Sequence, residues 1–419
     1  MENYSIVIFI LAIMIGLSAI ADKIKLPYPV LLIVAGITVG FIPAIPDVEL
    51  NPDIVFLIFL PPLLYDAAFN IPFRDFKANI STISTLAISL VFITASGIAV
   101  AAHYMIPGMT WPLSFVLGAI LSATDAVAAI SITKGLGLSR TTNTILEGES
   151  LVNDASALVA YRFAVAAVTG TAFVFWWASL QFLILMGGGL LIGFAIGWIL
   201  AFITNRVQEN HLATISFMLL APFVTYLVAE DIHVSGVIAV VTLGLTIARF
   251  SNKVFSDHLK IQSKSIWDII IFMLNGLIFI LIGLQLPVVL RNISEHKVLP
   301  YIGYAFIITV IALLLRTSRV FFQKINLQRA FKKGGRRKIE LTSLLNFKDS
   351  LIISWSGMRG IVSLAIAIAL PEHLANGKPF PERSEIIFIS IMVVLFTVIG
   401  QGLSLPWLVK RLKIEKPDL

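Results

Sequence analysis

The chain alternates between long apolar stretches and short polar segments over its whole length. A helix that crosses a membrane needs about 20 mainly apolar residues, or roughly 17 to 25 when it is tilted. Stretches of this kind predict thirteen spans, at residues 4–21, 29–46, 53–69, 82–104, 113–134, 143–169, 174–204, 211–229, 235–249, 262–285, 298–323, 350–370 and 385–409. We therefore expect an all-α integral membrane protein in which residues 1–419 form a single transmembrane unit.

Composition agrees with this pattern and narrows the function. Hydrophobic residues make up 58% of the chain and charged residues 13%, whereas a soluble domain has about 25% charged residues. The chain has no cysteine, which excludes disulfides, iron–sulfur clusters and thiolate zinc sites. It has no Gly-Lys-Ser/Thr run of the Walker type and no His/Ser/Cys cluster within the spans. We expect neither an ATPase nor any other enzyme, and no cofactor.

Basic residues are distributed unevenly between the predicted loops. With the N-terminus outside, the inner segments hold 24 Lys and Arg residues and the outer segments hold 4. This asymmetry follows the positive-inside rule and predicts a multi-pass protein of the plasma (inner) membrane, with the N-terminus outside and the C-terminus cytoplasmic. The net charge of +7 then reflects orientation in the bilayer, and no nucleic-acid partner is expected. The basic loop 324–347 is predicted to be cytoplasmic, facing anionic lipid headgroups.

Two acidic residues lie at membrane depth, Asp125 in the fifth span and Asp154 in the sixth. An ionisable side chain at the centre of a bilayer costs roughly 2.5–3.5 kcal/mol even on the most lenient scale, and such residues mark ion pathways. The alternative is a salt-bridged structural acid. It is disfavoured for Asp154 because no base lies three or four residues away from it. The two carboxylates predict a route for cations and protons.

Further oxygen atoms accompany these acids. Ser150 and Asp154 are four residues apart and therefore share one face of a helix. A hydroxyl and a carboxylate on one face suit a small hard cation, which prefers oxygen ligands. Asp125 and the backbone near Thr124 add oxygens, and Asp66 in the third span is another acidic candidate.

Two predicted spans carry signs of an interruption. Small residues crowd around Asp125 in the fifth span, and Arg359 stands between Gly357 and Gly360 in the twelfth. Transporters often build an ion site from two discontinuous helices of inverted repeats. We therefore predict an inverted-repeat fold in which Arg359 offsets the half-helix dipoles at the crossing. Buried Glu149 needs a counter-charge, for which Arg316 is the candidate.

These motifs together resemble a known family. Glu149-Ser-x-x-Asn-Asp154, Thr124-Asp125, Phe59-Leu-Pro-Pro-Leu-Leu-Tyr-Asp66 and Gly357-x-Arg-Gly360 are similar to the sodium/proton exchanger (NHE/NhaP-type) branch of the monovalent cation:proton antiporters. The resemblance covers spans two to thirteen. One departure is that Ala126 follows Thr-Asp, where the family usually has Pro, so the break in the fifth span is expected to differ in shape.

The resemblance implies a homodimer that works by an elevator-like movement. Residues 82–169 and 298–409 would form the mobile ion-transporting core, and 1–69 and 174–285 the dimerisation scaffold. It implies that Na⁺ is bound by the side chains of Asp154, Asp125 and Ser150 and the backbone of Thr124, with Asp66 nearby. Glu149 and Arg316 would form a core-stabilising ion pair. Asn153 is counted with Asp154, Asp125, Ser150, Thr124 and Asp66 among the cation- or proton-binding residues, and as an amide in place of a second acid it resembles the electroneutral exchangers. Many members have a long cytoplasmic tail, so this chain is expected to be either tailless or truncated.

The predicted function is therefore a secondary antiporter that exchanges Na⁺, or Li⁺ or K⁺, for H⁺ and serves pH homeostasis. Its partners would be these ions, membrane lipid and a second copy of the chain. Three other classes were considered besides a K⁺/H⁺ exchanger. A cation channel would be expected to show filter-like loops, an organic-anion symporter would need a larger polar pocket, and an enzyme lacks a catalytic cluster.

Overall fold

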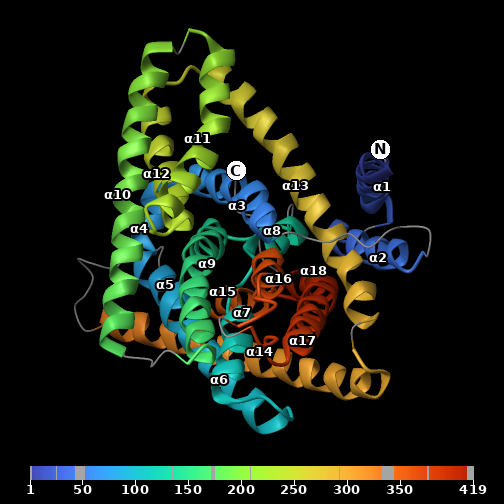
Figure 1. Ribbon diagram of the computed structural model, residues 1–419. Coiled ribbons are helices and arrows are strands. Elements are labelled where there is room, and N and C mark those ends of the chain that lie inside the picture. The colour runs from blue at the N-terminus through green and yellow to red at the C-terminus, as the bar shows by residue number, and fades with distance from the viewer. Residues whose placement is uncertain are drawn as a thin grey trace.

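The computed structural model describes residues 2–24, 26–42, 52–133, 136–170, 175–207, 209–291, 293–332, 344–374 and 377–412. Regular structure in these ranges is helical, apart from one isolated β-bridge between His373 and Pro379 (Figure 1). The predicted all-α fold class is thus confirmed.

Seven helices come from the two segments predicted to form the scaffold. They are α1 (Glu2–Ile24), α2 (Tyr28–Gly40), α3 (Pro52–Asn70), α10 (Phe175–Val207), α11 (His211–Asp231), α12 (Gly236–Val254) and α13 (Asp257–Arg291). In Figure 1, α10, α11 and α12 lie on one side of the molecule and α1 and α2 on the other, with α13 running obliquely between them.

The remaining helices include the two long helices α9 and α14. They are α4 (Phe73–Ala78), α5 (Ile80–Ser84), the π-helix η1 (Thr85–Leu90), α6 (Val91–Met105), α7 (Trp111–Ile120), α8 (Ala126–Thr133), α9 (Arg140–Val168), α14 (Glu295–Lys332), α15 (Phe347–Trp355), α16 (Ile361–Ile368), α17 (Arg383–Leu395), the π-helix η4 (Phe396–Gln401) and α18 (Gly402–Arg411). They gather in the lower part of Figure 1.

Each of the thirteen predicted stretches overlaps a helix or consecutive helical segments. In the described ranges, seven helices are long and apolar enough to cross a membrane, and five shorter ones are also apolar. The number of crossings remains a prediction. Several boundaries differ from the predicted ones: α2 ends at Gly40, α13 extends from Asp257 to Arg291, and α14 continues to Lys332. The segment predicted as the loop 324–347 therefore begins as a helix. Residues 333–343 of that segment lie outside the described ranges.

Close helix packing explains several glycines. A Cβ atom placed on Gly193 of α10 would lie 2.1 Å from the Ala239 carbonyl oxygen of α12. This glycine therefore serves close packing between two helices of the same chain. A second close contact joins α2 and α13, where a Cβ on Gly36 would lie 2.2 Å from the Ile280 carbonyl oxygen. Small residues let membrane helices approach closely in this way.

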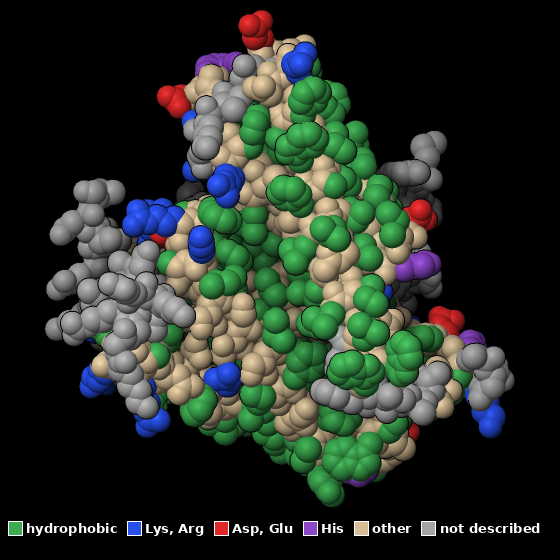
Figure 2. All heavy atoms as spheres, turned by 90° about the vertical axis from the view of Figure 1, so that its left-hand side faces the viewer, with side chains coloured by type: hydrophobic (Ala, Val, Ile, Leu, Met, Phe, Trp, Pro, Cys, Tyr) green, Lys and Arg blue, Asp and Glu red, His purple; other side chains and the backbone are tan. Residues whose placement is uncertain are grey.

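The outward face of α10 is strongly apolar. Leu191, Phe194 and Trp198 are all exposed there. Figure 2 shows that hydrophobic side chains cover most of this face of the molecule, with few charged side chains among them. A soluble protein rarely exposes so large an apolar surface, and this face is suited to contact lipid.

Candidate ion-binding site at two broken helices

Two pairs of short helices are separated by irregular backbone in the middle of the molecule. Helix α7 ends at Ile120 and α8 begins at Ala126, while α15 ends at Trp355 and α16 begins at Ile361. These are the two discontinuous helices that the sequence predicts. The breaks meet directly, because the Asp125 N–H donates to the Met358 carbonyl oxygen at 2.8 Å.

Gly360 is required by this close approach. A Cβ atom at position 360 would lie 1.9 Å from Oδ2 of Asp125, closer than any Cβ contact in real structures. The absence of a side chain at Gly360 therefore leaves the space that the Asp125 carboxylate occupies.

Asp125 also caps the second half of its own broken helix. Its Oδ1 accepts hydrogen bonds from the N–H groups of Val127 at 2.8 Å and Ala128 at 3.4 Å. The first N–H groups of a helix have no partner within the helix, and an aspartate at this position satisfies them. The carboxylate is thereby oriented by the helix that follows it.

Helix α9 supports the same break through Ser150. The Ser150 hydroxyl donates to the Thr124 carbonyl oxygen at 3.1 Å, and its oxygen accepts from the Ala126 N–H at 3.3 Å. A buried backbone group without a partner is costly, so Ser150 stabilises the irregular backbone on both sides of Asp125. Asp154 lies one turn further along α9 and is 6% exposed.

Arg359 lies near the C-terminal ends of α7 and α15, which are the first halves of the two broken helices. Its Nε donates to the Leu121 carbonyl oxygen at 2.9 Å, and its Nη1 to the Gly357 carbonyl oxygen at 2.6 Å. The carbonyl ends of helices carry partial negative charge. The buried guanidinium therefore lies where the half-helix ends of α7 and α15 concentrate that charge.

Glu149 and Arg316 form a buried ion pair between α9 and α14. Each side chain is 2% exposed. Arg316 Nη1 contacts Glu149 Oε1, Nη2 donates to Oε2 at 2.8 Å, and Nε donates to the Ile353 carbonyl oxygen at 2.9 Å. This two-pronged geometry is the favourable one for arginine and carboxylate. The pairing proposed from sequence is present in the structure.

Asn153 does not line the main pocket. Its Nδ2 donates to the Thr124 hydroxyl, and the Thr124 hydroxyl donates in turn to Glu149 Oε1 at 3.2 Å. Asn153 lines a much smaller void next to Arg316 and Arg359. It therefore contacts the site through Thr124, whereas the sequence analysis placed it among the cation-binding residues.

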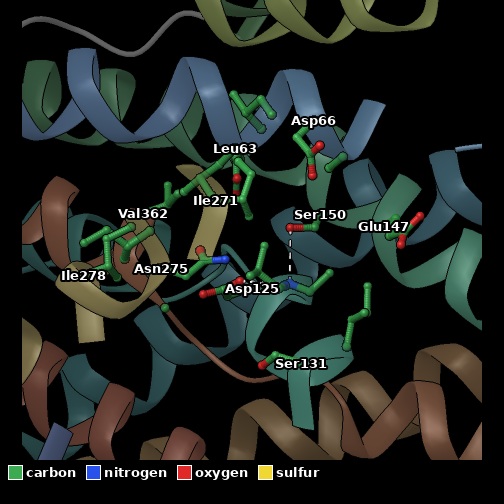
Figure 3. A pocket seen from close by; sticks show the side chains of 18 of the residues that line it. Leu63, Asp66, Asp125, Ser131, Glu147, Ser150, Ile271, Asn275, Ile278 and Val362 are labelled. Carbon is green, nitrogen blue, oxygen red and sulfur yellow. Dashed lines mark hydrogen bonds between the residues drawn. The ribbon is translucent and has the colours of Figure 1, made fainter. Parts of the chain in front are cut away.

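The main pocket has a volume of about 500 Å³ and lies beside the point where the two broken helices cross (Figure 3). Asp125, Asp154, Ser150 and Thr124 line it, and so does Asp66 of α3. The structure thus brings five of the six predicted cation- or proton-binding residues to one cavity. Asp66 also accepts a hydrogen bond from Asn70 Nδ2 at 2.8 Å.

The sequence analysis missed several polar residues of this pocket, among them two acids and an amide in predicted spans. Glu147, Asp268 and Asn275 line the same cavity. Glu147 and Asp268 lie close to the starts of the predicted spans 143–169 and 262–285, where an acid is usually interpreted as an ordinary residue at a span boundary. Asn275 lies near the middle of α13, and a single amide in an apolar span was the only signal that pointed to it.

Arg162, for which the sequence suggested no partner, pairs with Glu230 of α11. Its Nη2 lies 3.1 Å from Glu230 Oε2. Both side chains are partly exposed, and the pair lies outside the main pocket. It links α9 to α11 and is separate from the ion site.

The arrangement has a clear chemical capacity. Two buried carboxylates from different helices share a cavity with a hydroxyl and a backbone carbonyl, and hard cations prefer such oxygens. The carboxylates also accept protons, so a cation and a proton compete for the same atoms. The cavity is therefore suited to bind either one.

Comparison with known proteins agrees with this geometry. A family model described as "Sodium/hydrogen exchanger, transmembrane" matches residues 8–411. The chain is 35% identical, over 98% of its length, to the sodium, potassium, lithium and rubidium/H(+) antiporter of Bacillus pumilus, of which it covers 62%. It is 31% identical, over 98% of its length, to the Na(+)/H(+) antiporter ApNhaP of Aphanothece halophytica, of which it covers 75%.

A second Bacillus protein gives the same picture. The sodium, potassium, lithium and rubidium/H(+) antiporter of Bacillus subtilis is 34% identical over 96% of this chain, which covers 61% of that protein. The chain thus spans less than two thirds of the length of both Bacillus relatives.

Among solved structures, the sodium proton antiporter MjNhaP1 from Methanocaldococcus jannaschii superposes with a TM-score of 0.71. The match covers 99% of each chain at 22% identity. At this level of identity the likeness concerns the fold.

Proposed function

The chain belongs to the sodium/hydrogen exchanger family, as its motifs predicted, and from this premise we propose that it is a secondary antiporter that exchanges Na⁺ for H⁺. Members of this family are multi-pass membrane transporters. The observation that carries the proposal is the single cavity in which Asp154 and Asp125 meet Ser150 and Thr124 at two broken helices.

Asp154 is the residue on which the two ions would alternate. The ionised carboxylate binds Na⁺, together with Asp125, Ser150 and the Thr124 carbonyl, whereas protonation removes the charge that attracts the metal. Each loaded form crosses the membrane. The empty, charged form does not, because a bare carboxylate in hydrocarbon is too costly. Coupled exchange follows from this competition without ATP.

Three acids that line the pocket indicate which side of the membrane it faces. Asp66, Glu147 and Asp268 all lie on helices that carry or adjoin basic residues: Arg74 and Lys77 after α3, Arg140 at the start of α9, and Lys264 in α13. Basic segments favour the cytoplasmic side. We propose that the pocket faces the cytoplasm, with the N-terminus outside and the C-terminus inside.

Three finer properties belong to the same proposal. The chain would work as a homodimer, with core helices from 82–169 and 298–409 moving against a scaffold from 1–69 and 174–285. The crossing of the broken helices by Arg359, and the Glu149–Arg316 pair, would hold the core together as it moves. Exchange would be electroneutral, since Asn153 adds no second acid beside Asp154.

K⁺ is the second candidate substrate. The printed names of the two Bacillus relatives include potassium as well as sodium, lithium and rubidium. The oxygen donors of the pocket suit any alkali cation. The choice between Na⁺/H⁺ and K⁺/H⁺ exchange is therefore one of relative affinity at a single site.

The test is a flux assay on the full chain in proteoliposomes. An inward Na⁺, Li⁺ or K⁺ gradient should drive proton efflux, measured with a trapped pH dye, and Asp154→Asn should abolish it. A cation flux that needs no counter-moving proton would indicate a channel and refute the proposal. Liposomes without protein and liposomes with Arg162→Gln, a residue outside the pocket, serve as controls.

A further inference from the structure

Asn275 is an amide in an otherwise apolar part of α13. It lies near the midpoint of that 35-residue helix and is 6% exposed. It lines the main pocket, and its side chain forms no hydrogen bond with any described residue. Figure 3 shows its side chain extending from α13 into the pocket toward Asp125.

An unpaired amide at this depth calls for a partner. Burying an amide without a hydrogen bond costs about 1–3 kcal/mol by protein mutational data, and surrounding lipid offers it no polar group. The polar partners within its reach are therefore the contents of the pocket. Its neighbours on the same wall, Phe272, Ile278 and Phe279, are apolar and cannot serve.

The oxygen donors of the site are already partly used. Asp125 Oδ1 accepts from two N–H groups of α8. The Ser150 hydroxyl donates a hydrogen bond to the Thr124 carbonyl oxygen and accepts one from the Ala126 N–H, so both of these groups already have partners. A cation that leaves its hydration shell to bind Asp125 and Asp154 therefore lacks neutral oxygens on the side that faces α13.

We propose that Asn275 is a cation ligand of this transporter that acts only while the pocket has its present opening. Its amide oxygen approaches a cation held by Asp125 and Asp154 from the scaffold side. The ligands Asp154 and Ser150 come from α9, and Asp125 and Thr124 come from the break between α7 and α8. Asn275 is thus the ligand on a separate element.

This assignment rests on the proposed antiport and adds a sidedness to it. When the core helices move relative to α13, Asp125 and Asp154 move together and Asn275 stays behind. The cation then loses one oxygen ligand in the opposite state. Asn275 raises the affinity for the cation on the cytoplasmic side and leaves the affinity on the outer side unchanged.

The experiment measures the two faces separately. Everted and right-side-out membrane vesicles are prepared from cells that produce the full chain, and the apparent KM for Na⁺ is measured in each. Asn275→Leu keeps the size of the side chain and removes its oxygen. It should raise the cytoplasmic KM about tenfold, which corresponds to about 1.4 kcal/mol, and leave the outer KM within twofold of wild type.

Two further variants make the result specific. Asn275→Ser returns an oxygen atom and should recover part of the lost affinity. Ile271→Val removes one methyl group from the same wall of the pocket without touching a polar atom, and both KM values should stay at the wild-type level. If Asn275→Leu does not reach the membrane folded, Asn275→Ala and Asn275→Ser carry the same comparison.

The outcomes separate this inference from the function on which it rests. Wild-type vesicles without cation-driven proton flux would refute the antiport, and the role of Asn275 with it. Active wild type with an unchanged cytoplasmic KM in Asn275→Leu would overturn the ligand assignment alone. An equal rise in KM at both faces would overturn the sidedness and make Asn275 part of the permanent site.

Discussion

Gly360→Ala tests how closely the two broken helices approach each other. The added Cβ would lie 1.9 Å from Oδ2 of Asp125, 2.5 Å from its Cβ and 2.6 Å from its Cγ. Since Cβ contacts under 3.0 Å essentially do not occur, Oδ2 has to retreat by at least about 1.1 Å. The whole side chain is affected, because the contacts include its root as well as its tip.

That displacement has two costs. Overpacking a buried site costs about 1–3 kcal/mol, and moving Asp125 weakens its hydrogen bonds to α8, a capping interaction worth about 0.5–2 kcal/mol. A reacting group misplaced by about 1 Å can lose on the order of 10²-fold in rate. By analogy we expect the KM for Na⁺ to rise between about tenfold and a hundredfold, with the protein still folded.

The assay is Na⁺-driven proton flux in proteoliposomes, together with a thermal melt of the purified protein. Gly303→Ala is the matched control, because a Cβ at that position of α14 meets no atom within 4 Å. The reasoning is refuted if Gly360→Ala has the wild-type KM for both Na⁺ and Li⁺. In that case the Asp125 carboxylate either lies elsewhere or does not bind the cation.

Four other predictions concern the site and the topology. Asp154→Asn should leave a folded protein without exchange, and near-wild-type flux would show that the acid is structural. Glu149→Gln and Arg316→Gln should each cost roughly 3–5 kcal/mol by leaving a buried charge unpaired, and the double variant should cost less than their sum. If the changes in melting temperature of the two single variants add up to that of the double variant, Glu149 and Arg316 do not interact. Lower pH should raise the KM for Na⁺ without making flux sensitive to membrane potential, and a KM independent of pH would exclude competition on one carboxylate. Cysteines introduced at Lys332 and Glu372 should be labelled from the cytoplasm and from outside respectively, and the reverse labelling would overturn the predicted orientation.

Much of the fold was predictable because bilayer length and helix length are linked. Apolar stretches marked the long helices but not the short polar helix α4 or the end of α14. Gly-x-Arg-Gly and Thr-Asp marked both breaks. The Glu149–Arg316 pair was also within reach, since two opposite charges at membrane depth have few alternatives. The two π-helices were not predicted, because Thr85–Leu90 and Phe396–Gln401 read as ordinary apolar helix.

The remaining features depend on long-range contacts that no local pattern encodes. The close approach of Gly193 to Ala239 depends on which helix lies beside α10, and no local pattern identifies that partner. Arg359 was expected to offset helix dipoles, yet its carbonyl partner at Leu121 lies 238 positions away in sequence. Asn275 could not be identified as a pocket residue from the sequence, because no local pattern shows that α13 lies opposite Asp125.

The side chains at the crossing also define a formal charge. Glu149, Asp125 and Asp154 contribute three negative charges when ionised, and Arg316 and Arg359 contribute two positive charges. The set then sums to −1, and either one Na⁺ or one H⁺ brings it to zero. In the proposed exchange both loaded states would therefore be neutral in the low-dielectric interior, and only the empty state would be charged. A substitution that removes Arg359 would leave the loaded set at −1, so its effect would be seen in the dependence of flux on membrane voltage as well as in the rate.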